Sequence, residues 1–457
     1  MRAVPSSDNS QLIYGLNDQP PWRALILLSF QQVVLMSSTL VLPSVLISDL
    51  GGGIGAASQM VAMSMLACGL GTMLQAWAWR GFGSGYLCPN FCGPNFFAAS
   101  VSAAWLGGVP LMRGMTIAAG LAELLFARYF QRIKSFLPTE ITGLVLFMVG
   151  VGLIPVAMSK SLGIDFAGDP VNAKTLGVAF STLFIMVVMS LSGRRSLRLY
   201  GLLIGISIGY ALTIASGLMP YSTWSQLAAS SWVGMVRLDG FTDFAFRWEL
   251  LPVFLIVSLC GSLKTFGNVA LAQRVNDPDW HEPDMVSVQG GLFADGLTVT
   301  LSGLLGGLAS DTSASNVALS QSSGATSRRI AYWAGGLFML LAFSPKLTTF
   351  LALVPTPVIG AILIYITCLV MAAGLRMMLH QTLTPANGYV LGTALVVGLS
   401  LDMTPQLYLY VPDWLRPLFG SSLTLATITA IVLSQLLRLT TQQHRSSAQG
   451  HQPSDRR

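Results

Sequence analysis

The sequence has little charge. Only 10% of its 457 residues are Asp, Glu, Lys or Arg, whereas soluble proteins carry about 25%. With 53% hydrophobic residues and a mean hydropathy of +0.64, the chain has too little polar surface for a water-facing globule. Apolar runs of about twenty residues, the length that spans a bilayer, recur along it and argue against a soluble protein with a few buried helices. Examples are 24–47, 141–158, 176–191, 202–218 and 423–437.

Histidine and paired cysteine are also scarce. The four histidines form no metal-binding pair, and the five cysteines are scattered and odd in number, which argues against a disulfide framework. Cys88 and Cys92 lack a partnering His or Cys motif, so we expect no metal site. We therefore expect no catalytic residues and no cofactor, and a transporter rather than a membrane-embedded enzyme.

The net charge of +6 comes from clusters of Lys and Arg between apolar runs. If the helices are threaded alternately from a cytoplasmic N-terminus, these clusters all fall on the cytoplasmic side. This bias predicts a multi-pass protein of the plasma (inner) membrane with an even number of spans, both termini in the cytoplasm, and no nucleic-acid partner. The clusters are Arg128/Arg132/Lys134, Arg194/Arg195/Arg198, Arg328/Arg329 and Arg438/Arg445/Arg456/Arg457.

The chain contains an internal repeat. "LPTEITGLVLFMVG" begins at Leu137 and "VPTPVIGAILIYIT" begins at Val354, 217 positions later. The same offset aligns 94–103 with 311–320 and nearly superposes the segments around Gly120 and Gly336. We count about seven spans in each half, and halves with an odd number of spans are inverted relative to one another.

Two polar segments occupy corresponding places in these halves. Residues 84–100 and 310–327 are interrupted by Gly, Pro, Asn and Ser and are too short to span as continuous helices. Non-helical backbone at membrane depth lines a cavity or is packed in protein, so each predicts a short extended piece followed by a half-helix. The helix N-termini would then face each other and favour acceptors or anions. The alternative is that both are ordinary polar loops.

Three motifs resemble the nucleobase–ascorbate transporter family, the second class of nucleobase:cation symporters, also called the xanthine/uracil permease family. They are "GGLFADGLTVTLSGLLGG" (290–307), "SNVALSQSSG" (315–324) and the repeated Pro-Thr-x-x-x-Gly. The resemblance covers roughly 20–438. It implies an all-α fold of about fourteen spans in two inverted sevens, with broken helices 3 and 10. It also implies an elevator-type permease for uracil, xanthine, urate, other purines or ascorbate, with a proton or sodium ion.

The resemblance further implies a core domain that binds substrate and a gate domain that forms a homodimer. The expected boundaries are 1–22 for a cytoplasmic tail, 23–130 and 249–345 for the core, 131–248 and 346–438 for the gate, and 439–457 for a disordered tail.

The family's site residues map unevenly onto this chain. Ser315 stands where the tenth-span motif has an acid or amide, Asn316 matches, and Ala294-Asp295-Gly296 of span nine is intact. Gln31 and Gln32 replace a frequent Gln-His. The remaining expected contacts are Asn95, Phe96 and Phe97 on span three and the hydroxyl of Ser313.

Lys264 is the most informative position. Span eight of the family reads Glu-x-x-Gly-Asp, and this chain has Lys264-Thr265-Phe266-Gly267-Asn268. An uncompensated charge at mid-bilayer costs at least ~3 kcal/mol, and an ammonium offers only donors where a carboxylate accepts. We therefore expect a substrate with an anionic or acceptor-rich edge. Alternatively, Lys264 only pairs with Asp295.

The sequence leaves both the coupling ion and the transported substrate open. Asp295, Asn268 and Glu123 are candidate coupling or structural groups, and Glu140 suits a helix start. A proton or sodium ion could be co-transported, or diffusion could be uncoupled. A carrier or channel for a carboxylate or inorganic anion on the same fold is the second reading.

Overall fold

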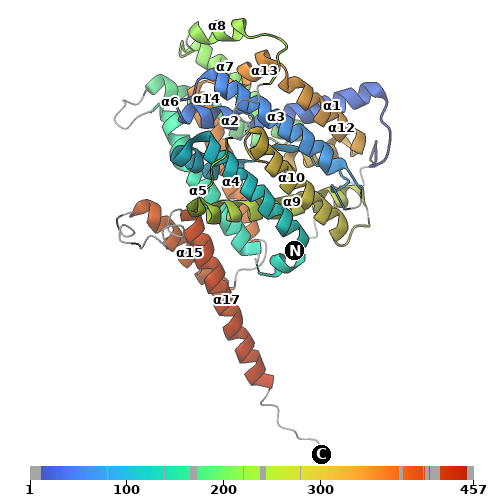
Figure 1. The fold of residues 1–457 in the computed structure, drawn as a ribbon, viewed down its shortest axis with the longest axis vertical. Helices are drawn as coiled ribbons and strands as arrows, with labels where there is room; N and C mark the ends of the chain where they lie inside the picture. Colours follow the sequence, from blue (N-terminus) through green and yellow to red (C-terminus); the bar gives the residue numbers. More distant parts are fainter. Residues whose placement is uncertain are drawn as a thin grey trace, which may run out of the picture.

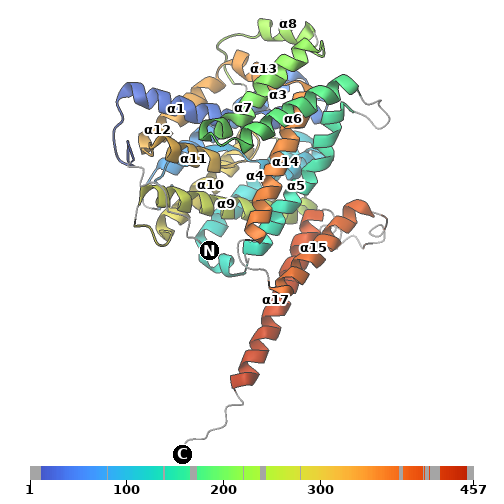
Figure 2. The same cartoon turned by 180° about the vertical axis from the view of Figure 1, so that it is seen from behind.

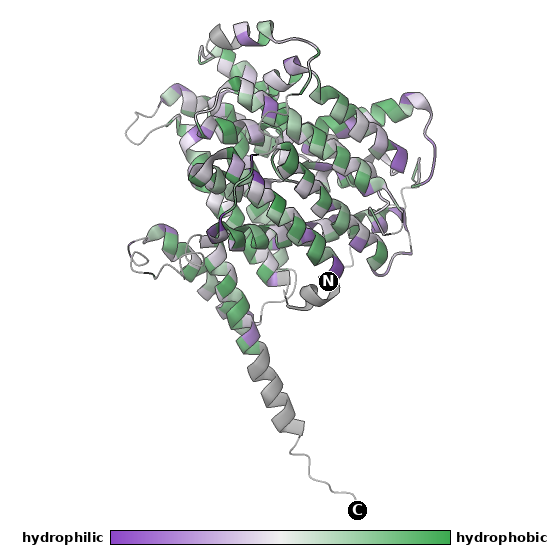
Figure 3. Cartoon of the chain, viewed as in Figure 1, coloured by the Kyte–Doolittle hydropathy of each residue, from purple (hydrophilic) through white to green (hydrophobic). Residues whose placement is uncertain are grey.

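Helices make up nearly all of the regular structure. The computed structural model of the chain describes residues 12–79, 81–136, 139–164, 172–219, 221–236, 243–277, 279–379, 384–404, 406, 411 and 422–449. Within these ranges eight helices are long and apolar enough to cross a bilayer, or nine if the bent pair α12 (Arg328–Ala342) and α13 (Pro345–Ala352) is one span. Hydrophobic segments lie along the outer helices (Figure 3), where Phe184, Leu191 and Leu340 are exposed. The predicted multi-pass membrane protein is confirmed.

The first half of the chain runs through seven segments. They are α1 (Trp22–Met36) with η1 (Ser37–Thr39) and α2 (Val41–Asp49); α3 (Ile54–Ala76); β1 (Asn90–Cys92) with the start of α4 (Pro94–Phe136); the rest of α4; α5 (Thr139–Leu162); α6 (Ala173–Leu191); and α7 (Arg195–Ala215). The short α8 (Tyr221–Ala229) and η2 (Trp248–Leu250) lead into the second half.

The second half repeats this order. Its segments are α9 (Leu251–Asn276); α10 (Met285–Leu305); β2 (Ser310–Thr312) with α11 (Ala314–Ser323); α12 with α13; α14 (Thr356–Met378); α15 (Pro385–Met403); and α17 (Ser422–Gln449). The expected fold of about fourteen segments in two halves is confirmed.

Both predicted half-helices are present. α4 loses helical geometry at Gly107 and Gly108, and Gly108 has a φ of +71°, a left-handed conformation that favours glycine. α11 ends after Ser323 at Gly324, whose φ is +63°. A half-helix over 94–106 therefore precedes the longer part of α4, and α11 is its counterpart in the second half.

The extended pieces before the half-helices pair as a two-stranded antiparallel sheet, with Phe91 opposite Asp311. Gly93 N donates to Ala309 O at 2.9 Å, and Ser313 N donates to Pro89 O at 2.8 Å, so the two halves make mirrored hydrogen bonds. The predicted all-α fold is confirmed, and the two short extended pieces expected before the half-helices are the strands β1 and β2. Extended backbone at membrane depth must find hydrogen-bond partners, and each strand supplies those of the other.

The two halves interlock through their helices. The longer part of α4 packs on α10, and its counterpart α12 packs on α3, the counterpart of α10. Glycine permits both close approaches. A Cβ at Gly120 would lie 2.4 Å from the backbone N of Thr300, and one at Gly335 would lie 2.5 Å from the carbonyl O of Gly69. The sequence repeat around Gly120 and Gly336 marks these contacts, displaced by one residue in the second half.

The helices form two packing groups. α1 to α4 and α9 to α12 contact one another, and α5, α6, α7 and α14 form a second group that α15 and α17 join through α5 (Figures 1 and 2). Relatively few contacts connect the groups. The division of the chain into core and gate domains, with boundaries near 130, 248 and 345, stays a prediction.

The described chain begins with a segment that contacts the α11–α12 connection and ends with the helix α17. Near the N-terminus, Tyr14 bridges to Ala325, Thr326 N donates to Tyr14 O, and Arg328 N donates to Leu16 O. The predicted N-terminal tail thus binds the α11–α12 connection. Helix α17 extends to Gln449 through residues that favour helix, such as Gln, Arg and Ala, and the disordered tail expected from 439 stays a prediction. Residues 1–11 and 450–457 lie outside the described part.

Candidate functional site

The two half-helices begin beside one another, directly after the paired strands. Ser313 is the N-cap of α11, and its Oγ accepts from Asn316 N at 3.3 Å. Asn95, in the first turn of α4, donates from Nδ2 to Asp311 Oδ2 at 2.8 Å. The side chain of one half-helix therefore holds the strand that leads into the other.

Lys264 on α9 reaches this junction. Its Nζ lies 2.8 Å from Asp311 Oδ1 and 4.8 Å from the ring centroid of Phe91. The Asp311 side chain is fully buried, while 21% of the Lys264 side chain remains exposed. The alternative in which Lys264 only pairs with Asp295 is corrected. Lys264 binds the carboxylate on β2, and its neighbour Thr265 binds Asp295.

Asp295 and Asn268 lie in a buried polar network behind the strands. Asp295 accepts from Thr265 Oγ1 at 2.7 Å and from Asn90 Nδ2 at 3.2 Å. Asn268 donates to the carbonyl O of Thr312 at 3.0 Å and to its Oγ1 at 2.9 Å. These bonds fasten β1 and β2 to α9 and α10. These buried hydrogen bonds hold the strands that carry Phe91 and Asp311 in place.

Gln32 and Asn316 bind each other. Asn316 Nδ2 donates to Gln32 Oε1 at 2.7 Å, and Gln32 Nε2 donates to Ser320 Oγ at 2.9 Å. Both side chains are buried. These two predicted site residues therefore join α1 to α11, whereas Gln31 beside them is half-buried.

The accessible residues at the junction are a smaller set than predicted. Ser315 is exposed in the first turn of α11, Gly267 is exposed on α9, and Lys264 and Phe91 are half-buried. We use the name junction opening for these four accessible residues, of which Lys264 and Phe91 are in contact. The junction opening offers an ammonium, a hydroxyl and one aromatic face.

Phe96 and Phe97, predicted as the aromatic wall, are both fully buried. Phe96 packs near Gly261 of α9. Phe97 lines a cleft of about 620 Å³ among α4, α5, α9, α15 and α17. The aromatic ring beside Lys264 is instead Phe91, because the antiparallel strand register places it opposite Asp311. The role of Phe96 and Phe97 as an aromatic wall for the substrate stays a prediction.

Sequence reasoning missed Asp311 and Phe91 as site residues. One signal was available, since an acid within an intramembrane segment is itself a candidate for function. This signal was obscured because the 217-residue offset of the repeat aligns Asp311 with Pro94. In the structure the half-helices begin at Pro94 and Ala314, so the residue that corresponds to Asp311 by strand position is Phe91.

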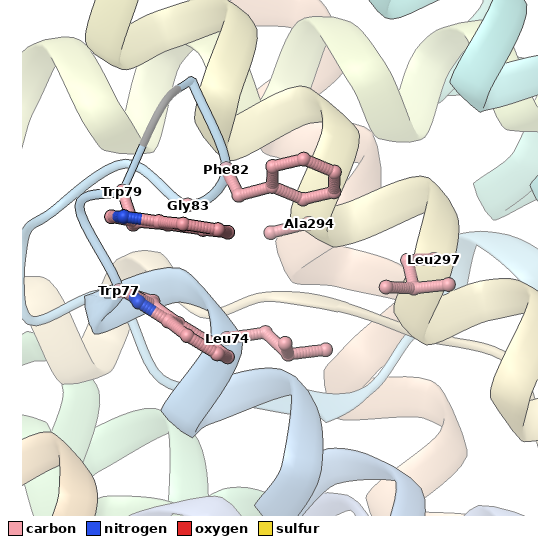
Figure 4. Close-up of a pocket in the computed structure, with 7 residues that line it drawn as sticks. All are labelled: Leu74, Trp77, Trp79, Phe82, Gly83, Ala294 and Leu297. Carbon is pink, nitrogen blue, oxygen red and sulfur yellow. The ribbon is translucent and has the colours of Figure 1, made fainter.

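A separate apolar pocket of about 230 Å³ lies between the end of α3 and α10. Trp77 and Trp79 stack with ring centroids 6.4 Å apart, and Phe82 and Leu74 point toward Leu297 of α10 (Figure 4). Its described lining carries no charged group. A polar solute would find no charged partner there, so the junction opening is the better candidate site.

Comparison with known proteins decides the family. The sequence model of the xanthine/uracil permeases, described as "Permease family", matches residues 23–407. The chain belongs to this family. Among the relatives of this permease, the xanthine permease XanP of Escherichia coli strain K12 is 26% identical over 446 residues, which are 94% of this chain and 96% of XanP. The uric acid permease PucK of Bacillus subtilis strain 168 is 25% identical over 413 residues, covering 90% and 94%.

Solved structures show the same fold. The transmembrane domain of the bicarbonate transporter BicA from a cyanobacterium superposes with a TM-score of 0.55 at 12% identity, covering 92% of this permease and 99% of that domain. Together, the fold and the family establish a multi-pass membrane transporter of a small molecule. They agree with the expectation of a permease and not an enzyme.

Proposed function

We propose that this permease carries a nucleobase-like small molecule, such as a purine, uracil or urate, with an acceptor-rich or anionic edge directed at Lys264. The relatives named for xanthine and uric acid support this substrate class. The choice of an acceptor-rich or anionic edge rests on the partly exposed side chain of Lys264, whose ammonium lies against the ring of Phe91.

The donors of the junction opening suit such an edge. The ammonium has three N–H donors and no acceptor, and one donor is used by Asp311 at 2.8 Å. The exposed part of the side chain leaves donor capacity toward the opening, where the hydroxyl of Ser315 is also accessible. The carbonyl oxygens of an oxopurine or a pyrimidine accept such bonds, and the face of Phe91 offers a stacking surface.

Asp311 favours a nucleobase over a small inorganic anion. It lies in contact with Lys264 and removes the net positive charge that would attract a compact anion such as sulfate. The remaining interaction between Lys264 and a substrate is directional hydrogen bonding, which discriminates between substrates by shape. A carrier or channel for a carboxylate or inorganic anion is therefore the weaker alternative, and the likeness to BicA concerns the fold alone.

The proposed transport cycle is an elevator-type alternating access, in which the group containing α9 to α11 moves against the group containing α5 and α14. The sparse contact between the groups supports this motion. We further propose secondary active transport, a homodimer formed through the second group, and a plasma-membrane location with both termini in the cytoplasm, as the distribution of Lys and Arg favours.

The test is ligand binding by purified protein, measured as thermal stabilisation with xanthine, uracil, urate, acetate and sulfate. Lys264→Gln should weaken nucleobase binding about 10- to 100-fold, the equivalent of one hydrogen bond to a charged group. Lys160→Gln is the matched control, because Lys160 forms a similar pair with Asp49 at 2.9 Å on another helix. Wild-type affinity for a nucleobase in Lys264→Gln, or stabilisation by sulfate alone, would overturn the proposal.

A further inference from the structure

Glu123 is a buried acid that the recognition of substrate does not use. It lies in the longer part of α4 and is 1% exposed. Neither of its carboxyl oxygens has a hydrogen-bond partner among the described residues. Buried carboxylates in native proteins are almost always hydrogen-bonded or paired, so this group needs a physical explanation.

Two glycines make room for the Glu123 side chain. A Cβ at Gly261 of α9 would lie 2.9 Å from Glu123 Oε1 and 3.4 Å from the ring of Phe96. A Cβ at Gly296 of α10 would lie 2.9 Å from the Cβ of Glu123. The carboxyl group therefore occupies the seam of α4, α9 and α10, one helical turn along α9 from Lys264.

Around this seam, the described residues provide no cationic side chain to pair with the Glu123 carboxyl group. Asp295 on α10 and Asp311 on β2 both act on it with negative charge. Lys264 neutralises Asp311, and the other charged residue of α9, Arg274, lies in its last turn. The charged residues of the other helices packed on α4, namely α2, α5 and α14, lie at helix ends: Asp49, Glu140, Lys160 and Arg376.

An ionised carboxylate at such a place costs several kcal/mol, so burial favours the neutral, protonated form of Glu123. A sodium ion does not fit as well, because hard cations take about six oxygen ligands. Gly261, which lies beside Glu123 Oε1, has no side-chain oxygen to offer, and neither carboxyl oxygen has a hydrogen-bond partner among the described residues. In the described part of the chain no group of three His, Cys, Asp or Glu side chains could hold a metal ion.

We propose that Glu123 is the proton-binding site that couples substrate to proton in this permease. A substrate that engages Lys264 with an acceptor or anionic edge weakens the compensation of Asp311 and makes the cluster of three acids more negative. Binding is therefore favourable when Glu123 holds its proton and unfavourable when it has lost it. Proton and substrate are then taken up together. This inference rests on the proposed site at Lys264 but does not depend on which nucleobase is carried.

The experiment measures xanthine, uracil and urate affinity of the purified full chain from roughly pH 5.5 to 8.5. The wild-type affinity should fall as the pH rises, by up to about tenfold per pH unit once Glu123 ionises. Glu123→Gln, which keeps a neutral side chain of the same size, should bind tightly with a flat pH profile. Glu140→Gln is the control at the start of α5 and should keep the wild-type profile. Comparing variants removes the titration of the ligand itself.

A second measurement covers the case in which Glu123→Gln does not fold. Calorimetry of the wild type in buffers of different ionisation enthalpy gives the number of protons taken up with substrate, expected to approach one near the midpoint of the profile. A pH dependence in Glu123→Gln equal to that of the wild type, or no proton uptake on binding, would overturn the assignment of Glu123. Absence of nucleobase binding at every pH would instead overturn the proposed function.

Discussion

The pair of Lys264 and Asp311 is electrostatically asymmetric, and this leads to a prediction about its removal. The Asp311 side chain is fully buried, whereas 21% of the Lys264 side chain is exposed. Two opposite unit charges 2.8 Å apart attract by about 6 kcal/mol at an effective dielectric constant of about 20, before either desolvation cost is subtracted. We predict that Lys264→Met destabilises the protein more than Asp311→Asn does.

The magnitudes follow from what each variant leaves behind. Lys264→Met leaves a buried carboxylate whose described donor is Asn95 alone, which costs about 3–5 kcal/mol. Asp311→Asn leaves an ammonium that keeps the ring of Phe91 and its contact with the opening, at a cost of about 1–2 kcal/mol. The double variant has neither charge and should resemble Asp311→Asn. The coupling energy therefore equals the cost of Lys264→Met, about 3–5 kcal/mol.

The assay is the unfolding midpoint of purified wild-type, single-variant and double-variant protein in the same lipid or detergent. The pair of Lys160 and Asp49 is the control. Its side chains are 11% and 9% exposed, so its two single variants should cost similar amounts. The reasoning about Lys264 and Asp311 is refuted if Lys264→Met costs no more than Asp311→Asn, or if the effects of the two substitutions simply add.

Two further predictions concern helix packing and capping. Gly335→Ala places a Cβ 2.5 Å from the carbonyl O of Gly69 and should cost about 1–3 kcal/mol, whereas Gly336→Ala meets open space and should be neutral or slightly stabilising in thermal unfolding. Equal effects of the two would contradict the close contact of α3 and α12. Asp284 caps α10, so Asp284→Ala should cost about 1 kcal/mol and Asp284→Asn much less. Burial raises the pKa of Asp284, but hydrogen bonds from Ser287 and the first backbone N–H groups of α10 outweigh it and hold that pKa below its ordinary value. Its contribution is therefore present above the pKa of the unfolded chain and is lost as pH falls through the folded pKa; an unfolding midpoint equally sensitive to Asp284→Ala at low and neutral pH would contradict this.

Much of the fold follows from features that are local in sequence. Charge scarcity and apolar runs predict the membrane helices, and the repeated Pro-Thr-x-x-x-Gly predicts the two halves. Interrupting Gly, Pro, Asn and Ser residues predict both half-helices, because a cluster of these residues disfavours a continuous helix. Lys264 stands out for the same reason, as a lone ammonium in an apolar helix.

The partners within the site depend on the register of two strands more than 200 residues apart in sequence. That register places Phe91, rather than Phe96 or Phe97, beside Lys264, and it brings Asp311 within 2.8 Å of the ammonium. A shift of one residue would turn both side chains to the other face of the sheet. Sequence patterns report which residues are unusual, but the choice of partner is a tertiary property. For this reason the pairing of Lys264 with Asp295 was a reasonable but wrong alternative.

Helices α3 and α4 of the first half pack on α12 and α10 of the second half, and this arrangement has a consequence for biosynthesis. During translation, α3 and α4 enter the bilayer well before the helices that cover Gly69 and Gly120 have been made. Until then, these small-residue faces and the acid of Glu123 are open to lipid or to the insertion machinery. A ribosome-released fragment that stops before α9 should therefore be a substrate for membrane quality control, and neither half of the gene is expected to yield a stable product when expressed alone.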